Sequence, residues 1–199
     1  MKKYFLELGG TFLLTLVVAL SLTHIFVVPT AILAGLVLMF AAYTIGNATG
    51  AHINPAITLG FLSVRKISVV DAVGYIIAQV AGALLALAVV QFGTHAVPVI
   101  SADMTSAVFF GEMLGALFFG FGIASIVYER VHTVFDGVVA GLSLFLGIAI
   151  ASMIGSNGVL NPAVALGIHS VNVLYVIAPI IGVVIGFWIV KIIHERSLV

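Results

Sequence analysis

Two copies of the triplet Asn-Pro-Ala in an otherwise apolar chain limit the possible folds more than any other feature of the sequence. The copies are Asn54-Pro55-Ala56 and Asn161-Pro162-Ala163. Asn is a favoured N-cap residue and Pro a favoured first helical residue, so each copy predicts a helix that begins at its Asn. The run that begins with the first copy, 54–63, covers ten residues. Ten residues make roughly 15 Å of helix, about half of the ~30 Å hydrocarbon core of a bilayer.

A half-length helix is tolerated at membrane depth only where protein or a water-filled cavity satisfies its free backbone end. The composition places the triplets at that depth, because 63% of the 199 residues are hydrophobic and only 7% are charged. These values exclude an ordinary soluble domain and predict a polytopic membrane protein. The zero net charge argues against nucleic-acid partners, and the absence of cysteine excludes thiol chemistry and cysteine-ligated metals.

The apolar segments that are long enough to cross a bilayer are predicted at 5–23, 31–49, 72–92, 107–128, 136–154 and 172–192. With this arrangement all seven Lys and Arg residues fall on one side of the membrane. The positive-inside rule then predicts that both termini are cytoplasmic. We expect an integral, multi-pass protein of the cell (inner) membrane.

The two halves of the chain repeat one another. The stretch Glu-Leu-Gly-Gly at 7–10 is echoed by Glu-Met-Leu-Gly at 112–115, and Ala-Gly-Leu at 34–36 recurs at 140–142. Each half contains an odd number of spans, so the second copy must enter the membrane inverted. Inverted repeats place a functional site near the midplane, at the interface between the halves.

The predicted fold class is therefore an all-α membrane protein with six transmembrane helices and two re-entrant half-helices in an inverted 3+3 repeat. We expect a single transmembrane channel domain over 1–199, with repeats at about 1–92 and 107–199. In this arrangement the N-termini of the half-helices meet near the midplane. Each N-terminus carries roughly half a positive charge, and the amides of Asn54 and Asn161 add N–H donors. Such a site repels cations and passes neutral solutes.

With these motifs the chain resembles the major intrinsic protein family, the aquaporins and glycerol facilitators. The similarity covers nearly the whole chain and includes the early Glu of each half, Gly-Ala-His-Ile-Asn-Pro-Ala at 50–56, Gln79 with Gly82, and Pro179 with Gly182. The resemblance implies a pore in each subunit and a homotetramer in the lipid bilayer.

The same resemblance implies supporting roles for three polar residues. Glu7 and Glu112 would be buried and would accept backbone N–H bonds that hold the re-entrant loops. The alternative for these carboxylates is a place at the membrane interface. His52 resembles the family's loop histidine, which lines the cytoplasmic vestibule or supports the loop.

The chain departs from the family at the pore filter. Water channels and glycerol facilitators carry Arg directly after the second triplet, where this chain has Val164. Counting from the motifs places the other filter positions at Ala34, at Ile148 or its neighbour Ala149, and at Gly158. The expected filter of Ala34, Ile148, Gly158 and Val164 is small, apolar and uncharged, so narrow selectivity for water does not follow.

These features predict a passive channel for water, for small uncharged solutes of the glycerol, urea, ammonia or hydrogen peroxide class, or for both. An enzyme is not expected, because no nucleophile–base set stands out, and neither a cofactor nor a metal site is expected from the scattered His residues. One alternative is a structural membrane protein with a poorly conducting pore. Another is a secondary transporter, which would need an ionisable residue at mid-span, whereas the acidic residues lie near span ends or connections.

Overall fold

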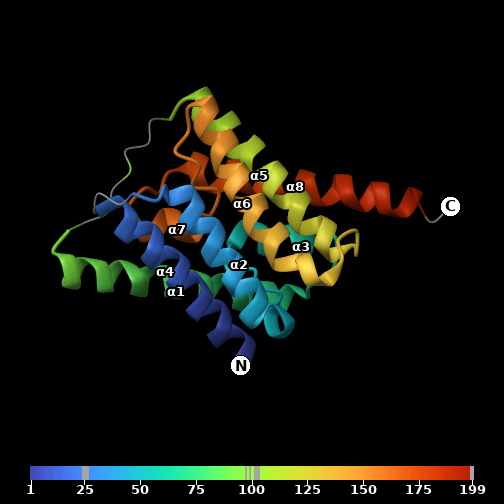
Figure 1. The fold of residues 1–199 in the computed structure, drawn as a ribbon, viewed down its shortest axis with the longest axis horizontal. Helices are drawn as coiled ribbons and strands as arrows, with labels where there is room; N and C mark the ends of the chain where they lie inside the picture. The colour runs from blue at the N-terminus through green and yellow to red at the C-terminus, as the bar shows by residue number, and fades with distance from the viewer. Residues whose placement is uncertain (24–26, 97, 99, 101–103, 198–199) are drawn as a thin grey trace.

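The computed structural model of the chain describes residues 1–23, 27–96, 98, 100 and 104–197, and its regular structure is helical (Figure 1). The long helices are α1 (Lys2–Thr23), α2 (Thr30–Thr49), α4 (Val69–Thr94), α5 (Ser106–Val127), α6 (Asp136–Ile154) and α8 (Val173–Arg196). The 3₁₀ turn η1 (Thr133–Phe135) leads into α6. Within the described residues, six helices are long and apolar enough to cross a membrane, which confirms the predicted spans.

The two short helices begin at the prolines of the repeated triplets. They are α3 (Pro55–Ser63) and α7 (Pro162–Gly167), with nine and six residues. Several long helices begin or end a few residues beyond their predicted apolar runs. Helix α4, for example, begins at Val69, where the Ser68 side chain accepts from the Asp71 N–H. The all-helical class and the half-helices agree with the sequence prediction.

The half-helices join the two halves of the chain. Helix α1 packs along α4, α5 packs along α8, and α2 packs against α6 across the halves. The half-helix α3 of the first half packs mainly on α8, and α7 of the second half packs mainly on α4 (Figure 1). Each half-helix therefore rests on the last long helix of the other half.

The crossing of α2 and α6 depends on two glycines. A Cβ atom at Gly35 would lie 2.8 Å from the carbonyl oxygen of Gly141, and one at Gly141 would lie 2.5 Å from the carbonyl oxygen of Gly35. Both distances are too short for a real side chain. Small residues of this kind let helices in a membrane approach until their backbones touch.

Replacing Gly35 by Ala is expected to destabilise the protein by about 1–3 kcal/mol, the usual cost of forcing extra volume into a packed interface. Gly46→Ala is the matched control in the same helix, since a Cβ there meets no heavy atom within 4 Å. Thermal unfolding of the purified protein in detergent measures both. Equal melting temperatures for the two variants would show that α2 and α6 can separate at no cost.

Candidate functional site

The two asparagines of the repeated triplets cap the half-helices. The side-chain oxygen of Asn54 accepts a hydrogen bond from the Ala56 N–H at 2.8 Å. The side-chain oxygen of Asn161 accepts from the Ala163 N–H at 3.0 Å and from the Val164 N–H at 3.3 Å. Pro55 and Pro162, which follow the two asparagines, take the first helical positions of α3 and α7, where a missing N–H costs nothing.

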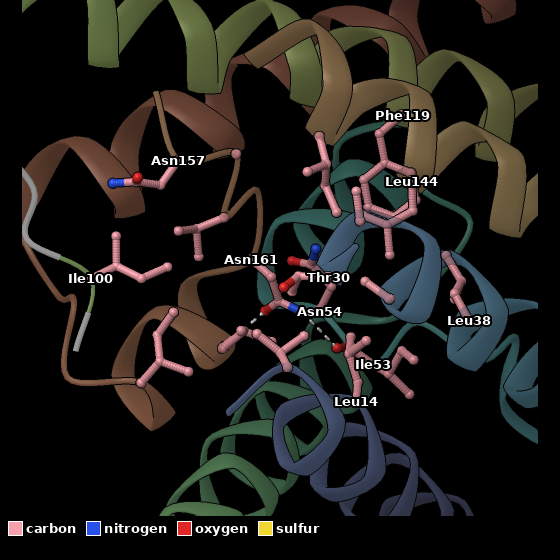
Figure 2. A pocket seen from close by; sticks show the side chains of 18 of the residues that line it. Leu14, Thr30, Leu38, Ile53, Asn54, Ile100, Phe119, Leu144, Asn157 and Asn161 are labelled. Carbon is pink, nitrogen blue, oxygen red and sulfur yellow. Dashed lines mark hydrogen bonds between the residues drawn. The ribbon is translucent and has the colours of Figure 1, made fainter. Parts of the chain in front are cut away.

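The same asparagines also bind the two motifs to each other. Nδ2 of Asn54 donates to the carbonyl oxygen of Leu160 at 3.0 Å, and Nδ2 of Asn161 donates to the carbonyl oxygen of Ile53 at 3.0 Å. Figure 2 shows the two side chains close together at the centre of the cavity. Each is only 2% exposed. The N-termini of α3 and α7 therefore meet inside the protein.

A buried carboxylate holds the loop that leads into α3. Oε1 of Glu7 accepts from the backbone N–H of His52 at 3.0 Å, and Oε2 accepts from the backbone N–H of Ile53 at 2.7 Å. The Gln79 amide donates to Oε2 at 2.8 Å. Glu7 has no exposed surface, so its place is the interior and not the membrane interface.

The second half repeats this contact. Oε1 of Glu112 accepts from the Val159 N–H at 2.9 Å, and Oε2 accepts from the Leu160 N–H at 2.7 Å. Leu160 has φ = +52°, and Ile53 at the equivalent place has φ = +38°. A positive φ is unusual for a bulky residue and a clear outlier for a β-branched one. The two carboxylates thus bind the backbone where each loop is strained.

His52 combines the two roles that the sequence left open. Its backbone N–H donates to Glu7, and ring atom Nδ1 lies 3.2 Å from the hydroxyl oxygen of Thr58. The ring stacks on Phe61, with centroids 3.9 Å apart, and meets the edge of Tyr75 at 5.0 Å. The side chain is 3% exposed, and that remaining surface faces the lumen described next.

A cavity of about 300 Å³ extends from the end of α1 to the paired asparagines, and we call it the outer cavity. Asn54 and Asn161 line it together with mostly apolar side chains (Figure 2). All the expected filter positions also line it: Ala34, Ile148, Gly158 and Val164. Of the two positions left open by counting, Ile148 is the one on the wall. Gly158 lies so close to it that a Cβ would be 2.8 Å from the Ile148 carbonyl oxygen.

A second cavity of about 290 Å³ lies between the C-terminal halves of α2 and α5, the start of α6 and the loop that leads into α3, and we call it the inner cavity. Its walls include Gly46, Phe61 and Asp136. Three residues line both cavities: Leu38, His52 and Phe119. In the part of the chain that the structure describes, no group of three or more His, Asp or Glu residues could hold a metal ion.

The sequence did not single out several lining residues. Phe119 follows Glu112 by seven residues, two helical turns on one face, and this spacing could have indicated a place near the lumen. Ile100 had no such signal, because its place depends on a tertiary contact. Its backbone nitrogen and carbonyl oxygen lie 2.9 Å and 2.8 Å from the Ser170 hydroxyl, which fixes it over the outer cavity.

Comparison with known proteins identifies the family. The sequence matches the major intrinsic protein family over residues 4–190. It is 31% identical to glycerol uptake facilitator protein-like 6 of Lactiplantibacillus plantarum, an alignment that covers 99% of this chain and 100% of that protein. It is also 31% identical to nodulin-26 of Glycine max, over 82% of this chain and 65% of that protein.

A solved structure has the same fold. The X-ray structure of the aquaglyceroporin from Plasmodium falciparum matches with a TM-score of 0.75, covering 98% of this chain and 96% of that chain. The sequence identity of that pair is 21%, so the match speaks for the fold alone. The family match and the two relatives confirm the resemblance that the motifs indicated. The chain is an integral, multi-pass membrane protein that belongs to the major intrinsic protein family of channels, and it is not an enzyme.

Proposed function

We propose that the protein is a passive pore for water and small uncharged solutes. The observation that carries this proposal is the meeting of two helix N-termini, capped by Asn54 and Asn161, at the inner end of the outer cavity. Each N-terminus contributes roughly half a positive charge at that point, so a cation meets a repulsive field. Each amide nitrogen also carries a second N–H, which can replace part of the hydration of a neutral solute.

The walls favour solutes beyond water. Ala34, Ile148, Gly158 and Val164 offer neither charge nor side-chain hydrogen bonds to the lumen. Apolar walls replace none of the hydrogen bonds that water loses, which penalises water more than a partly apolar solute. Glycerol, urea, ammonia and hydrogen peroxide are therefore the expected solutes beside water. Glycerol is further supported by the names of two similar proteins, the glycerol uptake facilitator and the aquaglyceroporin.

The flux follows the gradient of the solute itself. Among the described residues that line either cavity, the only Lys, Arg, Asp or Glu is Asp136, the first residue of α6, which lies at the end of its span and not at mid-span. A coupled transporter needs an ionisable group near its binding site to link the solute to protons or sodium ions. The lining supports a channel over a transporter.

The pore also has a proposed domain organisation, oligomeric state and orientation in the membrane. The chain forms one channel domain from the two inverted repeats and assembles as a homotetramer, as the family resemblance implies. Both termini face the cytoplasm of the cell (inner) membrane, because the Lys and Arg residues all lie on the side of the termini. The supporting roles of Glu7, Glu112 and His52 belong to this pore as well.

Stopped-flow light scattering on proteoliposomes tests the proposal. Vesicles with the protein should shrink and reswell faster than empty vesicles when water, glycerol or urea moves down its gradient. An imposed pH or sodium gradient should not drive accumulation of any solute. Permeability equal to that of empty vesicles for every solute would instead support the structural role without conduction.

Val164→Arg is expected to lower permeability to glycerol and larger polyols more than permeability to water. Arg would place a fixed charge and several N–H donors in the outer cavity, where Val164 is now 3% exposed beside Asn161. Val164→Leu adds volume without charge and is the matched control. The ratio of glycerol to water permeability in the same vesicles is the readout. An equal fall for both solutes in the Arg variant would show that charge and donors at this position do not select.

A further inference from the structure

The inverted repeat relates the walls of the two cavities to each other. Ala34 directly precedes Gly35, as Ala140 directly precedes Gly141, and the residue seven positions after each glycine is Ala42 or Ile148. Three residues before each asparagine stand Ala51 and Gly158, and three residues after stand Ile57 and Val164. The repeat thus assigns a counterpart to every filter position, and all the counterparts line the inner cavity: Ala42, Ala51, Ile57 and Ala140.

Each set of positions lines one cavity, and no member of either set lies in both walls. The outer cavity runs past the expected filter without interruption and continues to the paired asparagines. The counterparts on the inner side are equally small and apolar. The two cavities adjoin at the residues common to both walls, which are Leu38, His52 and Phe119. We call these three residues the central ring.

The central ring breaks the symmetry of the repeat. Phe119 follows Glu112 by seven residues and Leu14 follows Glu7 by seven, so these two positions are equivalent. His52 precedes Asn54 by two residues, and its equivalent is Val159. Leu14 and Val159 line the outer cavity alone, and they are smaller than the aromatic side chains of Phe119 and His52, which line both cavities.

The ring is also rigid. His52 is held between Phe61 and Tyr75 and next to the Thr58 hydroxyl, so its imidazole cannot swing out of the lumen without losing these contacts. Phe119 is 1% exposed and lies within the core. A closely packed aromatic wall sets a fixed limit on the size of a passing molecule.

We propose that the central ring, and not the outer filter, selects solutes by size in this chain. The inference rests on the proposed function and adds the place at which selection occurs. A solute enters the outer cavity with little restriction, reaches the two amides, and then passes a gap bounded by one aliphatic and two aromatic side chains. Phe119 is the specificity-determining residue of this gap.

Polyol permeability of proteoliposomes tests the ring. Phe119→Ala should raise the ratio of xylitol to glycerol permeability roughly tenfold, the change that about 1.4 kcal/mol in a barrier produces. Phe119→Leu installs the residue of the equivalent position and should raise the ratio in the same direction by a smaller factor. Leu14→Ala removes apolar volume from the wide outer cavity and should change the ratio far less.

The outcomes separate the two proposals. A wild-type protein that conducts no solute would overturn the proposed function, whatever the variants do. A conducting wild type whose xylitol-to-glycerol ratio stays constant in Phe119→Leu would overturn the inference alone, as would a larger change in Leu14→Ala than in either Phe119 variant. Thermal unfolding shows whether the Phe119→Ala variant is folded. If it is not folded, the permeability ratio of the Phe119→Leu variant decides the test.

Discussion

Replacing Asn161 by Asp is expected to convert a pore that repels cations into one that conducts them. Asp is as good an N-cap as Asn, so helix α7 should still begin at this residue. The substitution places a full negative charge where two helix N-termini contribute roughly half a positive charge each. A unit charge at 4 Å is worth about 4 kcal/mol at an effective dielectric constant of about 20, enough to reverse the sign of the local barrier.

Current through planar bilayers under an applied voltage measures this effect. The wild type should show no current above that of the bare lipid, whereas the Asp variant should carry sodium or potassium ions. Asn161→Ala removes the amide without adding a charge and is the control. Currents of the same size in the Ala and Asp variants would mean that the amide excludes ions by its hydrogen bonds and that the local field is unimportant.

The second large effect is expected from Glu112→Ala. This variant leaves the N–H groups of Val159 and Leu160 without an acceptor in the interior, at a cost of about 1–3 kcal/mol for each. Leu160 also loses the bond that holds its positive φ, a conformation that costs on the order of 1–3 kcal/mol. The sum is a large part of the roughly 5–15 kcal/mol that stabilises a typical protein.

Thermal unfolding in detergent and water permeability in proteoliposomes measure the outcome for this variant. We expect a strongly lowered melting temperature and loss of conduction. Glu112→Gln keeps one carbonyl oxygen as acceptor and should fall between the Ala variant and the wild type. Glu195→Ala, with a side chain that is 62% exposed, is the control. A Glu112→Ala protein that melts and conducts as the control does would contradict the supporting role of this carboxylate.

The half-helices could be predicted from the sequence because each one starts at two adjacent residues, an Asn and a Pro. Asn is a favoured N-cap and Pro a favoured first helical residue, so the pair followed by an apolar run indicates where a helix begins. The number of long helices followed from hydropathy alone. Positions such as Ala34 and Ile148 could be counted because the resemblance to the family implies their spacing from Asn54 and from Gly141. Both line the outer cavity in the structure.

The place of Phe119 could not be predicted in the same way. Apart from Glu112, the middle of helix α5 is apolar all round, so no polar stripe distinguishes the side toward the lumen from the sides toward lipid or protein. Only its seven-residue spacing from Glu112 relates Phe119 to the motifs, and hydropathy alone does not tell where its ring points. Ile100 is a different case, since its position is fixed by Ser170, seventy residues further along the chain. Contacts between residues so far apart in the chain produce no hydrophobic periodicity that could be recognised in the sequence.

The exchange of half-helices between the two halves also sets the order in which the protein can be completed during synthesis. Helix α3 leaves the ribosome early, but the helix on which it mainly packs, α8, is the last to be made (Figure 1). Until α8 has entered the bilayer, the re-entrant segment has α4 and Glu7 of α1 beside it but lacks the main part of the protein wall that a half-helix needs at membrane depth. The first half therefore cannot mature as an independent unit, and the arrival of α8 is the event that fixes α3 in place.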